Sequence, residues 1–151
     1  VAFMLELLQP ESGQKILDIG CGSGYTTALL AHIVDKGKVI GIEIVPELAK
    51  FAKNNVAKYG LIENRTVEVV CTNGSKGYPP EAPFDRILAS AASNATGANA
   101  QDKIPGTWKK QLKIGGRIVC PINNSIWLFT KTNETDFQKQ EFPGFVFVPL
   151  I

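Results

Sequence analysis

The residues with the clearest chemical potential form an alternating glycine run, DIGCGSG, at positions 18–24. The run lies between a short apolar segment, Lys15 to Ile19, and a segment with helical periodicity, Tyr25 to Val34. Glycine adopts positive φ and lets a ligand approach the backbone closely. A tight turn without a ligand is the plain alternative, but three alternating glycines between a strand and a helix favour a ligand-binding loop.

An acid follows this glycine loop at a spacing typical of nucleotide cofactor sites. Glu43 stands 23 residues after Gly20, between Ile42 and Ile44, at the end of a second apolar segment. A carboxylate at that place takes the ribose hydroxyls of the cofactor. An ordinary solvated strand end is the alternative interpretation, but the glycine loop makes the ribose role the favoured one.

Charge near the loop distinguishes between two classes of cofactor. The spacing is G-x-G-x-G, not the G-x-G-x-x-G that places a pyrophosphate at a helix N-terminus. Asp18 adds a negative charge that would repel a pyrophosphate. S-adenosylmethionine carries a sulfonium and an ammonium group and no phosphate. The pattern therefore predicts this cofactor rather than NAD, and with it a methyltransferase.

Segments with strand and helix character alternate along the chain and must position these residues. We expect strands at 15–19, 39–44, 66–71, 84–90 and 116–121, and a late antiparallel pair at 125–131 and 142–150. We expect helices at 1–8, 25–34 and from Pro46 to a stop at Gly60, with an irregular one at 101–112. The predicted inner face of the Pro46 helix comprises Leu48, Phe51, Ala52, Asn55, Val56 and Tyr59. The alternation predicts a doubly wound, mainly parallel α/β sheet in three α/β/α layers, with ligands beyond the carboxyl ends of the strands.

Composition limits the function classes further. The 151 residues are 44% apolar and 20% charged with a net charge of +2, which suits one globular domain and gives no sign of nucleic acid as a partner. We find no eighteen-residue apolar span and no signal peptide, so we expect a cytoplasmic protein, and a monomer. One histidine and no C-x-x-C pair predict no metal site. Cys71 and Cys120 end apolar runs and are expected to be buried thiols, as in a reducing cytosol.

Longer segments resemble a known family. They are LDIGCGSGY at 17–25, VIGIEIVPELAKFAKNN at 39–55, NGSKGYPPEAPFDRI at 73–87, LKIGGRIVCPI at 112–122 and FVFVPL at 145–150. The first and fourth are shared by many methyltransferases, whereas the third is close to a signature of the protein-L-isoaspartate O-methyltransferases. The chain resembles that family, within the Rossmann-like class I methyltransferases, over nearly its whole length.

The resemblance implies a role for each matching residue. The glycine loop, with Asp18, Gly20, Cys21, Gly22, Ser23 and Gly24, would line the methionine and ribose end of the cofactor. Glu43 would take the ribose hydroxyls, and Ile44 would lie against the adenine. Asn73 and Gly74 would sit at the adenine edge, and Ser90 and Ala91 would border the reacting methyl group. Val148, Pro149 and Leu150 would flank the substrate backbone.

Two departures from the family pattern affect these expectations. The family usually has Asp where this chain has Asn73, so we expect weaker cofactor binding because the acceptor loses its charge. The family also carries a Ser/Thr-containing substrate motif ahead of the first helix, and this sequence begins at Val1, at or just after the place where that motif would end. We therefore expect one methyltransferase domain, 1–151, that lacks the family's N-terminal substrate segment.

The implied reaction is methyl transfer to the α-carboxylate of L-isoaspartyl residues in damaged proteins, with S-adenosylhomocysteine as the product. A carboxylate is already ionised near pH 7, so no general base is required and no catalytic acid or base is assigned. One alternative keeps the cofactor and changes the substrate to tRNA or a small molecule. Another is a methyltransferase-like binding domain whose catalytic site is incomplete.

Overall fold

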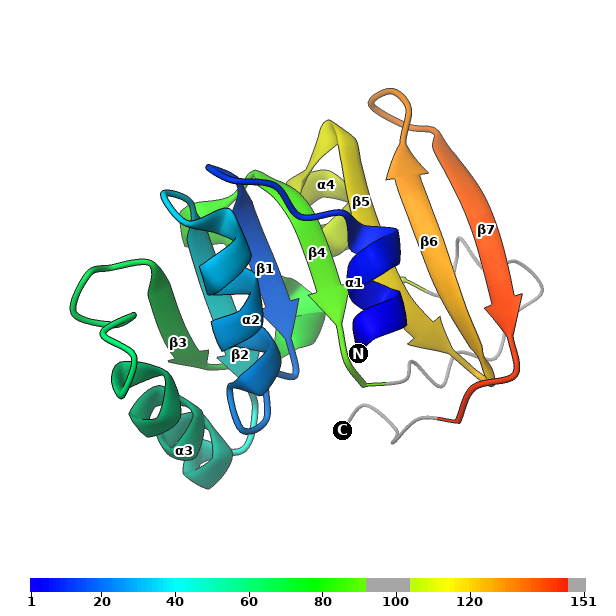
Figure 1. Cartoon of the computed structure of the whole chain (residues 1–151). Coiled ribbons are helices and arrows are strands. Elements are labelled where there is room, and N and C mark those ends of the chain that lie inside the picture. The colour runs from blue at the N-terminus through cyan, green and yellow to red at the C-terminus, as the bar shows by residue number, and fades with distance from the viewer. Residues whose placement is uncertain (92–103, 147–151) are drawn as a thin grey trace.

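The computed structural model describes residues 1–91 and 104–146, and within them seven strands form one sheet in the order β3-β2-β1-β4-β5-β6-β7 (Figure 1). The strands are β1 (Lys15–Ile19), β2 (Lys38–Glu43), β3 (Val67–Cys71), β4 (Phe84–Ala89), β5 (Leu112–Ile122), β6 (Ser125–Lys131) and β7 (Phe137–Pro143). The α-helices are α1 (Ala2–Leu8), α2 (Tyr25–Val34), α3 (Pro46–Ala57) and α4 (Gly106–Gln111). Strands β1 to β5 pair in parallel, and β6 and β7 are antiparallel to their neighbours.

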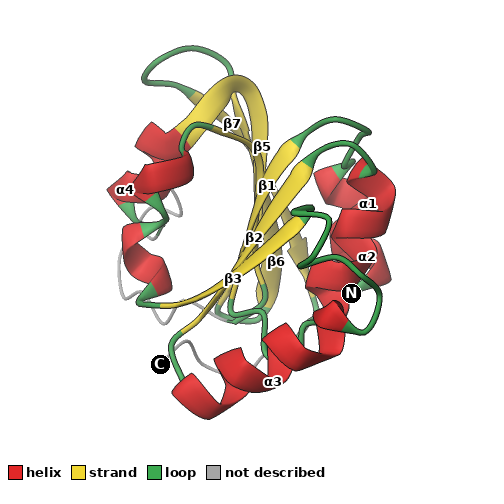
Figure 2. Ribbon diagram, turned by 90° about the vertical axis from the view of Figure 1, so that its left-hand side faces the viewer, coloured by secondary structure: helices red, strands yellow, loops and turns green. Residues whose placement is uncertain are grey.

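The helices cover both faces of the sheet. Figure 2 shows α1, α2 and α3 on one face and α4 on the other. Successive residues of β1 serve the two faces in turn, because Ile16 packs in the core with α1 to α3 and Leu17 packs in the core with α4. The predicted three-layer, doubly wound sheet with an antiparallel pair at its C-terminal end is confirmed.

The predicted inner face of α3 is wrong in part. Leu48, Phe51 and Tyr59 are 41%, 52% and 73% exposed, whereas Ala49, Ala52 and Val56 are buried. The reason is the close approach of α2: a Cβ added at Gly24 would lie 3.0 Å from the Ala52 carbonyl oxygen. Only small side chains fit such an approach, so the larger apolar residues face outward.

Two further expectations are corrected at the edges of the sheet. The last strand runs over Phe137–Pro143 rather than 142–150, because it pairs with β6 through a short hairpin and its polar sequence suits an exposed edge. Residues 144–146 are not in a strand, and 147–150 lie outside the described residues. Cys71 is exposed, because it ends β3 at the other edge of the sheet, whereas Cys120 in β5 is buried as expected.

The remaining elements differ from expectation mainly in their limits. The helix α4 begins after Pro105, and residues 101–103 of the region predicted as an irregular helix lie outside the described residues. The strand β5 begins at Leu112, four residues before the predicted start. Within the described ranges, no helix is both long and apolar enough to cross a membrane.

Candidate cofactor site

The strand pairing gathers the loops of interest at one edge of the sheet. Ile19, the last residue of β1, pairs with Ile42 of β2 on one side and with Ala89 of β4 on the other. Glu43, at the end of β2, pairs with Cys71 at the end of β3. The loops after these four parallel strands therefore meet around β1, where chain connections depart in opposite directions. This is the place where doubly wound sheets bind ligands.

The glycine loop has the backbone conformation that its sequence predicts. Gly20, Gly22 and Gly24 have φ angles of 76°, 53° and 85°, in the region that L side chains rarely adopt. The N–H groups of Gly20 and Cys21 both donate to the Ile42 carbonyl, at 2.8 and 2.9 Å, and so fix the loop to the end of β2. Gly20 also lies against Ala91, since an added Cβ would be 3.8 Å from the Ala91 Cβ.

Glu43 joins the glycine loop to the loop after β2. Its carboxylate accepts from the Gly22 N–H at 2.9 Å and from the Ile44 and Val45 N–H groups at 3.0 and 3.2 Å. The residue is only 7% exposed, so it is not an ordinary solvated strand end. A carboxylate offers about four acceptor positions, so one is left for a ligand hydroxyl.

Asp18 is the most unusual acid of the site. The residue is fully buried, and its Oδ2 accepts from the Thr27 hydroxyl at 2.6 Å while its Oδ1 has no hydrogen-bond partner. Burial raises the pKa of Asp18 to about 6, with a further contribution from Glu43 and opposition from the Thr27 hydrogen bond. Burial also raises the pKa of the Cys21 thiol to about 12, so that group stays neutral. A cation beside Asp18 would offset the cost of this buried charge.

The loop that follows β3 is held by hydrogen bonds from α4. Three side chains of α4 bond to its backbone: Trp108 Nε1 donates to the Gly74 carbonyl at 2.8 Å, Thr107 to the Ser75 carbonyl at 2.6 Å, and Gln111 to the Lys76 carbonyl at 3.0 Å. Gly74 itself packs on β1, since an added Cβ would collide with Cγ2 of Ile19. The loop carrying Asn73 is therefore fixed on two sides.

The other predicted site residues lie around this edge. Ile44 is 41% exposed, and an exposed apolar side chain directly after β2 suits contact with a flat ring. Asn73 is exposed, and its Oδ1 accepts from the Ser75 N–H at 3.0 Å, which leaves one acceptor position. Ser90 donates its N–H to the Ile19 carbonyl at 3.0 Å. Ser23 is exposed in the glycine loop, whereas Val148, Pro149 and Leu150 lie outside the described residues.

Most of the signature run 73–87 serves the fold rather than the site. Glu81 forms ion pairs with Lys15 and Lys38 at 3.3 and 2.7 Å, at the amino ends of β1 and β2. Arg86 is buried and donates through Nε to the Leu8 carbonyl at 2.7 Å, which anchors the end of α1. Only the start of the run, around Asn73, reaches the carboxyl edge of the sheet.

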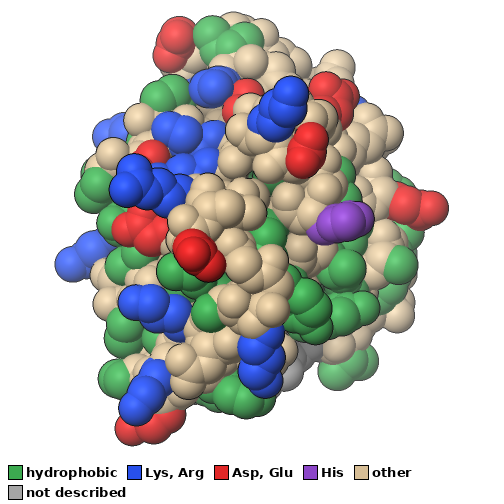
Figure 3. All heavy atoms as spheres, turned by 60° about the vertical axis from the view of Figure 1, so that its left-hand side comes forward, with side chains coloured by type: hydrophobic (Ala, Val, Ile, Leu, Met, Phe, Trp, Pro, Cys, Tyr) green, Lys and Arg blue, Asp and Glu red, His purple; other side chains and the backbone are tan. Residues whose placement is uncertain are grey.

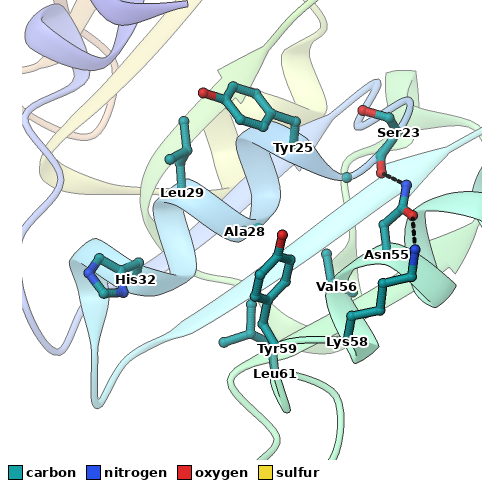
Figure 4. Close-up of a pocket in the computed structure, with 11 residues that line it drawn as sticks. Ser23, Tyr25, Ala28, Leu29, His32, Asn55, Val56, Lys58, Tyr59 and Leu61 are labelled. Carbon is teal, nitrogen blue, oxygen red and sulfur yellow. Dashed lines mark hydrogen bonds between the residues drawn. The ribbon is translucent and has the colours of Figure 1, made fainter.

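A groove of about 690 Å³ opens beside the site, between α2 and α3. Figure 4 shows Tyr25, Leu29 and His32 along α2, with Tyr59 across from them. The Asn55 amide joins the groove to the glycine loop by donating to the Ser23 carbonyl at 2.9 Å. On the face in Figure 3, basic side chains are interspersed with acidic and apolar ones, so no single-sign patch marks a polyanion site.

Comparison with known proteins then decides the family. The family model of protein-L-isoaspartate(D-aspartate) O-methyltransferase matches residues 1–151. The chain belongs to this family. It is 43% identical to the protein-L-isoaspartate O-methyltransferase of Methanopyrus kandleri over 156 aligned residues, which cover 100% of this chain and 65% of that protein. The resemblance carried by the sequence segments is thereby confirmed.

Solved structures agree on the fold. A protein-L-isoaspartate O-methyltransferase superposes with a TM-score of 0.86 at 29% identity, covering 99% of this chain and 45% of that one. A Plasmodium falciparum family structure in complex with S-adenosyl-L-homocysteine superposes with a TM-score of 0.84 at 23% identity, covering 99% of this chain and 72% of that one. The chain thus spans 65% of the length of the Methanopyrus kandleri relative and 45% of the length of the first solved structure.

Sequence reasoning missed three residues that the structure brings to the site. Thr27 donates a hydrogen bond to Asp18. It could have been recognised in the sequence as a polar residue at helical spacing from the buried Leu30 and Val34 of α2. Trp108 and Gln111 hold the loop after β3. No local sequence pattern indicated this contact, because the two residues follow that loop by more than thirty positions.

Proposed function

We propose that this chain binds S-adenosylmethionine at the carboxyl ends of β1, β2 and β4. We propose further that it serves methyl transfer to the α-carboxylate of L-isoaspartyl residues in proteins or peptides. The single observation that carries the cofactor assignment is the Asp18 carboxylate, which is fully buried and leaves Oδ1 without a hydrogen-bond partner. A cationic ligand explains such a group, whereas an anionic phosphate would aggravate it.

The residues present fit the cofactor from end to end. Glu43 would accept from the ribose hydroxyls, Ile44 would contact the adenine, and Asn73 with Gly74 would border the adenine edge. The loop Gly20 to Gly24, including Cys21, Gly22 and Ser23, would surround the amino-acid end. Ser90 and Ala91, of which Ala91 lies beside Gly20, would border the methyl group.

The chemistry demanded of the chain is modest. When bound, S-adenosylmethionine supplies an activated methyl group on a positively charged sulfur. The acceptor carboxylate is ionised at neutral pH and needs no base, so the chain's residues have to orient the two partners and exclude water. This is consistent with a site that offers buried acids and backbone contacts. The family relationship supports L-isoaspartyl residues as the acceptor, and Val148, Pro149 and Leu150 are proposed to flank it.

Calorimetric titration with S-adenosylhomocysteine tests the cofactor proposal. We expect saturable binding by the chain, lost or weakened by at least about tenfold in Glu43→Ala, since a charged hydrogen bond contributes about 1.5–3 kcal/mol. Glu47→Ala is the matched control, because Glu47 is an exposed acid in the first turn of α3. Absence of binding by the folded chain would refute the cofactor site.

Methylation of an isoaspartyl peptide tests the acceptor. The normal aspartyl peptide of the same sequence is the control, because it differs only in which carboxylate is free. Methylation of the isoaspartyl peptide alone supports the proposal. Binding of S-adenosylhomocysteine without methylation of either peptide would instead favour a binding domain that is catalytically incomplete. We also expect the chain to act in the cytoplasm and to be a monomer. Sedimentation of the purified chain would check the monomeric state.

A further inference from the structure

The two oxygens of the Asp18 carboxylate have different surroundings. Oδ2 accepts from the Thr27 hydroxyl at the short distance of 2.6 Å, and Oδ1 is buried without a partner. Asp18 and Thr27 are both fully buried, so water does not replace the hydrogen bond between them. A buried carboxylate that is bonded at one oxygen and has no partner at the other has a defined orientation and an uncompensated charge.

The position of Thr27 is set by its neighbours. It lies in the first turn of α2, directly after the glycine loop, and faces β2. Room for its hydroxyl exists because residue 41 is glycine: a Cβ there would lie 3.1 Å from Thr27 Oγ1 and 3.3 Å from Cys21 Sγ. Helical threonines commonly bond back to their own helix. Here the hydroxyl reaches across to β1 instead.

We propose that Thr27 is a positioning residue of the cofactor site, which holds Asp18 Oδ2 so that Oδ1 meets the ammonium group of the cofactor's amino-acid end. The inference rests on the proposed function and adds a residue to it. Thr27 acts through Asp18 and touches no reacting atom. Its removal is therefore expected to weaken recognition of the ammonium group while leaving recognition of the adenosine end intact.

The charges around Asp18 sharpen this expectation. Glu43 faces it from β2, Cys21 lies in the loop as a neutral thiol, and Thr27 faces it from α2. Glu43 raises the pKa of Asp18, and Thr27 is the contact that lowers it. Loss of the Thr27 hydroxyl would leave Asp18 more often protonated near neutral pH. A protonated Asp18 cannot pair with an ammonium group.

Two ligands separate the ammonium contact from the rest of the site. S-adenosylhomocysteine carries the ammonium group, whereas 5′-methylthioadenosine has the same adenosine and sulfur without the amino acid. At pH 7 we expect Thr27→Val to raise the Kd for S-adenosylhomocysteine on the order of tenfold and to leave that for methylthioadenosine within about twofold. Thr27→Ser restores the hydroxyl and should restore affinity. Thr26→Val is the matched control, since it makes the same change one position earlier on α2.

The pH profile provides a second readout. Between pH 5 and 7 the affinity of the unmodified chain for S-adenosylhomocysteine should fall as the pH drops through about 6, where Asp18 takes up a proton. In Thr27→Val the fall should begin at higher pH, and methylthioadenosine should show no such fall. Equal losses for both ligands, or no loss for either, would overturn the role of Thr27. Failure of the unmodified chain to bind either ligand would instead refute the proposed function, and the inference with it.

Discussion

The contact between α4 and the loop after β3 makes a strong prediction for Trp108→Phe. The indole is 1% exposed, and its Nε1 donates at 2.8 Å to the carbonyl of Gly74, which is itself buried. Phenylalanine keeps an aromatic ring in the core but removes the donor. The carbonyl, next to Asn73, would then keep a single donor, the Gly77 N–H at 3.0 Å.

The magnitude follows from that loss. Losing one of the two hydrogen bonds to this buried carbonyl costs about 0.5–1.5 kcal/mol, and the smaller ring adds a packing defect of about 1 kcal/mol. We expect the free energy of unfolding to fall by about 1.5–2.5 kcal/mol, which shifts the urea midpoint by about 1 M for a typical m-value. Because the loop carries Asn73, the Kd for S-adenosylhomocysteine should rise as well, on the order of threefold to tenfold.

Urea unfolding and calorimetric titration measure the two effects on one preparation. Trp127→Phe is the matched control, because the Trp127 ring stacks on Phe129 in β6, away from the loop after β3. It should lower stability less and leave the Kd unchanged. The reasoning would be wrong if Trp108→Phe left both quantities unchanged, or if Trp127→Phe weakened binding equally.

Three other predictions test the electrostatics and packing of the site. Asp18→Asn should stabilise the chain by about 3 kcal/mol at pH 7, because the native pKa of Asp18 lies at about 6 rather than 3.8. The gain should fall below about 1 kcal/mol at pH 4, where urea unfolding would be repeated. A destabilised Asp18→Asn at pH 7 would contradict this sign. Gly74→Ala should lower stability by about 1–3 kcal/mol through collision with β1, measured as a lower Tm, whereas an unchanged Tm would show that the loop can move aside. Alkylation of the native chain should modify Cys71 first, and Cys21 and Cys120 only after unfolding, because burial raises the pKa of both to about 12. Mass spectrometry would show the order of modification, and early modification of Cys21 would refute its burial in the loop.

The layers of the fold and its doubly wound, mainly parallel sheet were predictable from local sequence patterns. Apolar runs such as VIGIEI at 39–44 separate segments with helical spacing, and short right-handed connections leave few arrangements for them. The glycine loop and Glu43 were predictable for the same reason, since ligand contacts at strand ends depend on residues close in sequence to those ends.

Properties that depend on distant packing were not predictable. The phase of α3 was misjudged because the large apolar residues Leu48 and Phe51 outweighed the small Ala49 and Ala52, and only the closeness of α2 makes small size decisive. The limits of β7 depend on its pairing with β6, and the polar sequence of β7 does not indicate that pairing.

The hydrogen bond from Trp108 to Gly74 also gives the chain an internal optical reporter. The sequence has two tryptophans, and only Trp108 bonds to the loop at the proposed adenine edge. A ligand that shifts this loop would change the polarity and hydrogen bonding around one indole, and therefore its emission wavelength and lifetime. In Trp127→Phe that signal would come from a single fluorophore, so stopped-flow mixing could follow the arrival of unlabelled ligands in real time.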